Sequence, residues 1–240
     1  MTDQRKPKVF IGIPTHDSRL DAGCAKSLIF HGVQDSILCF HGSSLLAHNF
    51  NTLLCNAIAS GAEYFCLMHA DVEPMEANWL KKLIWILERE KYSVLSVASP
   101  IKDASGDTST ALMRDGHDVE RIPVAWTFER DEGVTEMFPD TFANGFMKGE
   151  TLMVNTGLML IKLSGINPVL NYFTITDAIQ LVDGKYIPRN LPEDWNFSLM
   201  LARDGIRYGV TREILINHIG QKAYPNRVAT ESDGVIEYKR

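Results

Sequence analysis

The feature of this sequence that most limits its possible folds is a regular alternation of apolar and amphipathic segments over the first hundred residues. Four short apolar segments, at residues 8–14, 36–42, 63–69 and 93–99, have the length and composition of buried strands. Helical patterns lie between them, at about residues 20–31, 45–60 and 78–90. Strands that are apolar throughout are covered on both faces. The alternation therefore predicts an α/β fold with a mostly parallel central sheet flanked by helices.

The pattern becomes irregular after residue 100. We predict short strands at residues 110–114 and 121–126, a flexible loop around residues 129–135 and a long apolar strand at residues 151–163. After a mixed segment we predict a helix at about residues 192–204, with Glu193 and Asp194 in its first turn and Gly205 just past its end. Strands at residues 206–212 and 214–220 complete the predicted core. The tail from residue 221 is predicted to be peripheral.

Composition excludes several classes of protein. The chain has 240 residues, of which 45% are hydrophobic and 22% charged, as in an ordinary soluble globular protein. Its net charge of -6 argues against a basic surface for nucleic acid, but a metal ion can still hold a nucleotide on an acidic protein. No apolar run reaches the roughly 20 residues of a membrane helix or resembles a signal peptide, so we expect a cytoplasmic protein. The four cysteines form no close pair of the kind that binds zinc, and we expect them to be reduced.

Acidic residues follow the third apolar segment, in the sequence "FCLMHADVEP" at residues 65–74. Ligands of parallel sheets bind beyond the carboxyl ends of the strands, and His69, Asp71 and Glu73 fall at such an end. Carboxylates there suit Mg²⁺ or Mn²⁺, which in turn neutralises a diphosphate. The alternative is that Asp71 and Glu73 cap the helix that begins near residue 78, or only face solvent.

Three further positions are candidates, each with a structural alternative. Glu193 and Asp194 either match the helix dipole or supply a general base. His218, in "INHIG", is either an edge residue of a strand or a ligand. Asn155 and Gly157 interrupt an apolar strand, where glycine often marks the close approach of a ligand or of backbone. The local residues leave these alternatives open.

Four features follow one another along the chain: the strand-end acids, "NTGLMLI", "PEDWNFSLMLARDGIRYGV" and "NHIG". In this order they resemble the GT-A fold glycosyltransferases, especially family 2-like members. That family has a Rossmann-like sheet and binds a sugar nucleotide through an Asp-x-Asp motif and a divalent metal. The resemblance covers about residues 9–220 and is strongest in the last third. It implies a single domain over residues 1–240, with a nucleotide-binding half at about 8–100, an acceptor-binding half at about 101–220 and the peripheral tail at 221–240.

The resemblance assigns the nucleoside to the first strand and the segment after the second. Pro14, Thr15 and Asp17 of "IGIPTHD" would lie near the base or ribose. His48 and Asn49 occupy the place where the family often has an Arg-Asn pair, so one expected phosphate contact is missing.

The metal site is assigned around Asp71, which matches the metal-binding acid of the family, with Glu73 as a helper. His69 replaces the first acid of the motif and could bind a ribose hydroxyl or the metal. His218 resembles the late histidine that completes the metal shell in many members.

The remaining roles concern the sugar and the acceptor. Asn155 and Gly157 would line the donor sugar and the acceptor. Asp194, or less favourably Glu193, would be the general base of an inverting enzyme. Residues 115–149 would gate or bind the acceptor.

The resemblance thus implies a hexosyltransferase-like enzyme that uses Mn²⁺ or Mg²⁺ and transfers a sugar from a UDP- or GDP-sugar to a saccharide or other hydroxyl acceptor, with inversion. Two alternatives stay open. A sugar nucleotidyltransferase would need a basic, glycine-rich loop after the first strand, whereas "PTHDSRLDAG" is acidic and nearly free of glycine. A non-catalytic nucleotide- or sugar-binding protein of the same fold would explain the departures at His69 and Asn49.

Overall fold

The computed structural model describes residues 8–31, 33, 35–103, 105–114, 118–130, 133–182, 184–220, 223–226, 229–232 and 235–238. Seven strands form its main sheet: Val9–Thr15 (β1), Ile37–Gly42 (β2), Tyr64–Met68 (β3), Val94–Val97 (β5), Thr141–Ala143 (β10), Leu158–Lys162 (β12) and Tyr208–Thr211 (β15). Their order is β10-β15-β5-β12-β3-β1-β2. Five of the seven run in one direction, because β12 is antiparallel to both β3 and β5 while β1–β2, β1–β3 and β5–β15 are parallel pairs. The predicted mostly parallel sheet is confirmed, with β12 and β10 as its antiparallel members.

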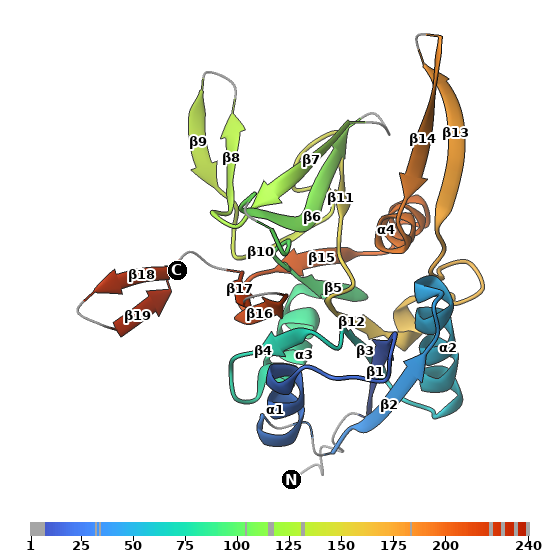
Figure 1. The fold of residues 1–240 in the computed structure, drawn as a ribbon, viewed down its shortest axis with the longest axis vertical. Coiled ribbons are helices and arrows are strands. Elements are labelled where there is room, and N and C mark those ends of the chain that lie inside the picture. The colour runs from blue at the N-terminus through green and yellow to red at the C-terminus, as the bar shows by residue number, and fades with distance from the viewer. Residues whose placement is uncertain are drawn as a thin grey trace.

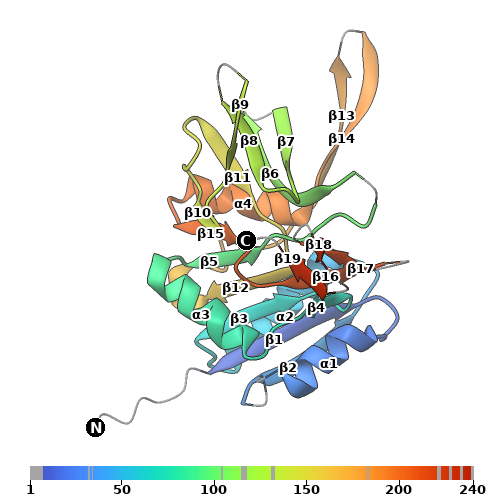
Figure 2. The ribbon, with the colours of Figure 1, turned by 90° about the vertical axis from the view of Figure 1, so that its left-hand side faces the viewer.

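Helices cover both faces of this sheet (Figure 1). The described residues form four α-helices: Ala22–Phe30 (α1), Leu46–Ala59 (α2), Trp79–Glu90 (α3) and Glu193–Arg203 (α4). α1 and α3 pack on one face with Val9 and Ile11 of β1, whereas α2 and α4 pack on the other with Phe10 (Figure 2). Both faces of β1 are therefore buried, which explains why its sequence is apolar throughout. None of the described helices combines the length and apolar character needed to cross a membrane.

The predicted long strand at residues 151–163 is wrong. The chain instead forms β11 (Glu150–Met153) and β12, which belong to different sheets. β11 pairs with β6 (Asp107–Arg114), and β6 also pairs with β7 (Asp118–Pro123). The break falls at Asn155, whose buried amide donates to Val97 O at 3.1 Å and so fixes the chain where it passes between the sheets.

The predicted flexible loop around residues 129–135 is also wrong. Its described residues belong to a hairpin of β8 (Thr127–Arg130) and β9 (Val134–Met137), while residues 131 and 132 lie outside the described part of the chain. Phe128 anchors the hairpin, with its ring centroid 4.6 Å from that of Phe138. The strand predicted at residues 121–126 ends early, at Pro123, because the chain turns there and Trp126 adopts a φ of 62°.

Two other segments acquire regular structure that the sequence patterns did not indicate. The mixed segment before α4 forms a hairpin of β13 (Thr176–Val182) and β14 (Lys185–Leu191), which projects from the molecule in Figure 1. The tail that we expected to be peripheral contributes β17 (Ala223–Pro225) to a small sheet with β16 (Ile216–Ile219) and β4 (Val72–Pro74). Asn226 is buried beside it and donates to Ile214 O at 3.0 Å. A last hairpin, β18 (Ala229–Ser232) with β19 (Val235–Tyr238), follows.

Candidate metal and nucleotide site

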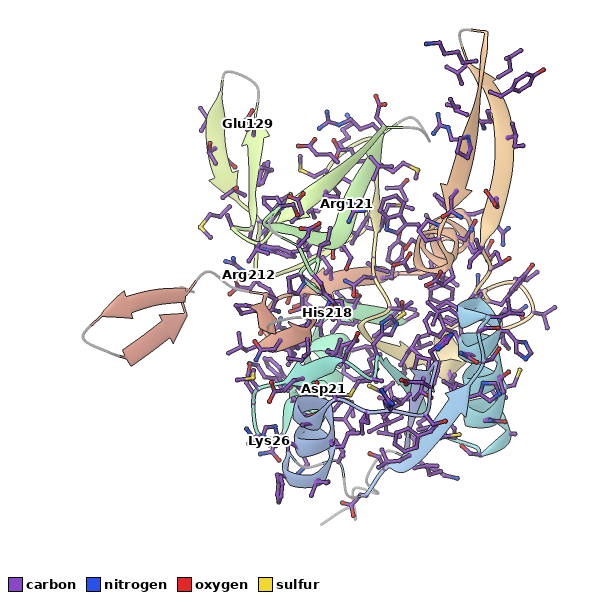
Figure 3. All side chains as sticks on the ribbon, viewed as in Figure 1. Asp21, Lys26, Arg121, Glu129, Arg212 and His218 are labelled. Carbon is purple, nitrogen blue, oxygen red and sulfur yellow. The ribbon has the colours of Figure 1, made fainter. Side chains whose placement is uncertain are left out.

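Three residues from two distant parts of the sequence meet where β3 ends. His69 follows the last residue of β3, and its N–H donates to Gly157 O at 2.9 Å. The chain then turns into β4, which pairs with β16 so that His218 lies opposite Val72, next to Asp71. This pairing brings one potential ligand atom each from His69, Asp71 and His218 within 4.8 Å of one another. Figure 3 shows His218 in the middle of the molecule, between Asp21 at the start of α1 and Arg121 of β7.

His218 is oriented by a backbone carbonyl. Its Nδ1 lies 2.8 Å from Pro100 O, which can only accept a hydrogen bond, so Nδ1 carries the proton. In the neutral ring the lone pair is then on Nε2, which lies 3.5 Å from Asp71 Oδ1. Metal-binding histidines are commonly held in this way, with the second ring nitrogen donating to a carbonyl or carboxylate.

Asp71 is the anionic member of the group. Burial works to raise the pKa of its carboxyl, but the interactions with His218 and Lys102 outweigh burial and hold the pKa well below its usual range. Lys102 Nζ forms an ion pair with Oδ2. Oδ1 is buried and has no hydrogen-bond partner among the described residues, since His218 Nε2 is too far for a good bond. Such an orphaned carboxylate oxygen is suited to accept a cation.

His69 is a neutral imidazole at physiological pH, because burial lowers its pKa to about 4. Its Nε2 lies 3.3 Å from Thr156 Oγ1, and its ring packs 5.5 Å from that of Phe50. Ligands around a metal at about 2.1 Å are at most about 4.2 Å apart, so the three residues need to move together only slightly to bind one ion. Two imidazoles and one carboxylate with a free oxygen therefore fit a divalent metal.

An open cavity of about 500 Å³ lies beside this group. Its wall includes Pro14, Thr15 and Asp17 from the end of β1, together with His69 and Asp71. The nucleoside residues expected from the sequence and two of the three candidate metal ligands thus share one cavity. Its volume is within the range of sites that bind small molecules and cofactors.

Glu73, the expected metal helper, is not among the three converging residues. Its Oε2 accepts a hydrogen bond from Asn217 Nδ2 at 3.1 Å. The side chain lies over Gly23 of α1, where an added Cβ would be 2.7 Å from Glu73 Cδ. The alternative that Glu73 or Asp71 caps the next helix is wrong, because α3 has no side-chain cap.

His48 and Asn49 stand at the start of α2. Asn49 is buried, with His41 Nδ1 2.7 Å from its Oδ1, and its Nδ2 donates to Ser43 O at 2.9 Å. Both ends of the Asn49 amide are thus occupied, one by His41 of β2 and the other by Ser43 of the loop that follows it. His48 is exposed.

Asn155 and Gly157 form a buried, hydrogen-bonded unit, here called the brace, that holds the backbone of His69 through Gly157 O. Asn155 Nδ2 also donates to Thr110 Oγ1 at 3.2 Å, and its Oδ1 accepts from Gly157 N at 3.1 Å. At Gly157 an added Cβ would lie 2.6 Å from Ser99 Oγ, so only glycine fits without movement. The close contact that we expected at this glycine is thus made by the side chains of Ser99 and Asn155.

The acidic pair at the start of α4 lies in a different environment. Burial, and next the charge of Glu193, raise the pKa of Asp194 to about 7, and burial also raises the pKa of Glu193. Asp194 Oδ1 accepts from Trp195 N at 2.8 Å. A second cavity, of about 300 Å³, lies beside Trp195 between β6, β7 and the β13–β14 hairpin. An acid that titrates near neutrality can accept a proton in catalysis.

Sequence reasoning missed Lys102, although it touches the central carboxylate. Lys102 lies in the loop between β5 and β6, 31 residues from Asp71, and no local motif marks it. Residues 115–149, expected to gate or bind the acceptor, include β7 and the β8–β9 hairpin, and none of the residues described in this range lines the 500 Å³ cavity.

Comparison with known proteins supports the fold. No family model and no curated sequence matches the chain. Among solved structures, A197 from STIV superposes with a TM-score of 0.51 over 97% of this chain and 94% of A197, at 14% identity. CMP:2-keto-3-deoxy-manno-octonic acid synthetase complexed with CTP gives a TM-score of 0.40 over 85% of this chain and 88% of its own, at 12% identity, which is too low to support an argument. With its mixed sheet flanked by helices, the chain has a GT-A-like α/β fold, as predicted from the sequence.

Proposed function

We propose that this protein is a metal-dependent glycosyltransferase that moves a sugar from a nucleoside-diphosphate sugar, UDP- or GDP-linked, to a hydroxyl acceptor such as a saccharide, with inversion. One observation carries the proposal: His69, Asp71 and His218 converge beside a cavity of about 500 Å³ at the carboxyl end of β1 and β3. In open α/β sheets, this end of the strands is where ligands bind.

The three converging residues would hold the metal, and Pro14, Thr15 and Asp17 would contact the nucleoside from the same cavity. When bound, the metal would supply positive charge that stabilises the diphosphate as it leaves. We assign Glu73 and Asn49 to structural roles, because hydrogen bonds within the chain occupy the Glu73 carboxylate and both ends of the Asn49 amide.

The donor set favours Mn²⁺ over Mg²⁺. Two of the three candidate ligands are imidazoles, and Mg²⁺ prefers an all-oxygen shell. Asp71 and the phosphates supply the oxygen ligands that suit Mn²⁺.

Asp194 would take the proton from the acceptor hydroxyl. Its pKa of about 7 leaves it partly ionised at physiological pH and basic enough to accept the proton. Glu193 contributes by charge, since it helps to raise the pKa of Asp194. Asn155 and Gly157 would act on the donor side indirectly, by fixing the backbone that holds His69.

A thermal-shift screen of UDP, GDP, CDP and dTDP with Mn²⁺, Mg²⁺ or chelator tests the proposal. A ligand that binds only the folded state raises its stability, by about 2.7 kcal/mol at a hundredfold excess over Kd. We expect one diphosphate to stabilise the wild type with Mn²⁺, with loss of the effect in chelator and in Asp71→Ala. Glu73→Ala is the matched control and is expected to keep it. No shift with any combination would refute the proposal.

Turnover separates the remaining alternatives. Wild-type protein that binds the diphosphate and metal but transfers no sugar from any donor is a binding protein. Formation of a sugar nucleotide from a nucleoside triphosphate and a sugar would instead identify a nucleotidyltransferase.

A further inference from the structure

We propose that Lys102 is a second cation of this site: it pairs with Asp71 while no metal is bound, and moves to the donor diphosphate when the metal takes its place. The inference rests on the proposed function and adds a diphosphate-binding residue to it. Neither the motifs of the sequence nor the family resemblance assigned Lys102 a role.

The geometry couples Lys102 to the same three residues. Its Nζ forms an ion pair with Asp71 Oδ2, the oxygen that does not face His218. The loop that carries it is fixed two residues earlier, where Pro100 bridges to Thr108 and accepts a hydrogen bond from His218 Nδ1. The backbone of Pro100 thus positions both a candidate metal ligand and the lysine that competes with the metal.

Electrostatic repulsion makes the Lys102 ammonium and the divalent metal compete for Asp71. The carboxylate of Asp71 carries one negative charge, which the ammonium of Lys102 already balances. A divalent ion bound to the same carboxylate would meet the full positive charge of Lys102 at close range, in a partly buried site where screening is weak. Repulsion between the two cations therefore favours opening of the ion pair when the metal binds.

Lys102 is free to move once displaced. Its side chain is 34% exposed and its ammonium sits at the end of a flexible stem. The ion pair with Asp71 is the polar contact that holds this ammonium in place. A diphosphate on the metal presents the nearest new negative charge. The ammonium would then bind phosphate oxygens from the side opposite the metal, taking over part of the role of the arginine that is absent beside Asn49.

The exchange predicts reciprocal coupling. Metal alone must break the ion pair without compensation, whereas metal with a diphosphate gives Lys102 a new partner. Each ligand should therefore raise the affinity for the other by the same factor.

A titration with Mn²⁺ tests the exchange without any turnover. Binding is measured as the decrease of the EPR signal of the free ion. In Lys102→Met, we expect Mn²⁺ alone to bind about fivefold more tightly than in wild type, because no ion pair has to open. The nucleoside diphosphate that stabilises the wild type with Mn²⁺ should bind about tenfold more weakly to this variant, because a charged hydrogen bond is lost. Lys102→Arg should restore both values toward wild type.

Lys162→Met is the matched control. Lys162 pairs with Glu88 at 2.8 Å and its side chain is 39% exposed, but it lies on β12 away from the cavity wall. It should leave both affinities unchanged. Equal Mn²⁺ affinity in wild type and Lys102→Met would overturn the exchange, as would unchanged diphosphate binding. Failure of every nucleoside diphosphate to bind, with or without metal, would instead refute the proposed function itself.

Discussion

The raised pKa of Asp194 has a direct consequence for stability. In the folded protein its pKa is about 7, against an ordinary value of 3.8. Between these values the folded state holds a proton that the unfolded chain has released, so stability falls as pH rises from about 4 to 7. A shift of about three units at about 1.4 kcal/mol each sets an upper limit of about 4 kcal/mol for this loss.

Asp194→Asn removes the titrating charge and keeps an oxygen to accept from Trp195 N. We expect the variant to be about 2 to 4 kcal/mol more stable than wild type at pH 8.5 and nearly equal to it below pH 4. Urea denaturation across that range, monitored by circular dichroism, measures the difference.

Asp204→Asn is the matched control, at the other end of α4. Hydrogen bonds from Arg203 and Asn171 lower the pKa of Asp204, so the same substitution should destabilise the protein at neutral pH. If the stability of wild type and Asp194→Asn changes in parallel with pH, Asp194 is not the desolvated acid described above, and its assignment as the base loses its support.

Four further predictions concern the hydrogen bonds of Asn155, the packing at Gly157, the metal and the base. Asn155→Ala leaves three buried partners without their hydrogen bonds and should cost about 3 kcal/mol of unfolding free energy in urea, whereas a near-neutral effect would contradict the brace. Gly157→Ala should cost about 1 to 3 kcal/mol by crowding Ser99, and Ser99→Gly in the same chain should recover most of it, which a thermal melt of the three variants would check. Because two candidate ligands are imidazoles, Mn²⁺ should raise the melting temperature in the presence of the diphosphate at lower concentration than Mg²⁺ does, and equal potency would count against the histidines as ligands. If Asp194 is the base, transfer by wild type should rise with pH to a plateau above about 7, and this rise should be absent from the residual rate of Asp194→Asn.

The first half of the fold could be predicted because each of its strands is buried on both faces. Phe10 and Ile11 face opposite cores, and this leaves an uninterrupted apolar segment that is easy to recognise. The β13–β14 hairpin was missed for the opposite reason. Ile179 and Tyr186 are 77% and 79% exposed, so no buried face imposes an alternating pattern on the segment.

The candidate site was predictable only in part. Asp71 was recognised beyond the end of a predicted strand and His218 within another, and the family resemblance pointed to both. The pairing of β16 with β4 brings them together. Glu73 was expected beside them, but Gly23 leaves space for its side chain over α1, where Asn217 binds it. Lys102 could not be found, because its link to Asp71 depends on a loop conformation set by Pro100 and not on spacing in the sequence.

The central claim is that His69, Asp71 and His218 bind one divalent metal. Pulsed EPR of Mn²⁺ bound to the protein measures it most directly, because nitrogen ligands couple to the electron spin of the ion. The account predicts coupling to two imidazole nitrogens in wild type, to one in His218→Gln, and loss of bound Mn²⁺ in Asp71→Asn. Bound Mn²⁺ without nitrogen coupling, or an unchanged spectrum in His218→Gln, would contradict it.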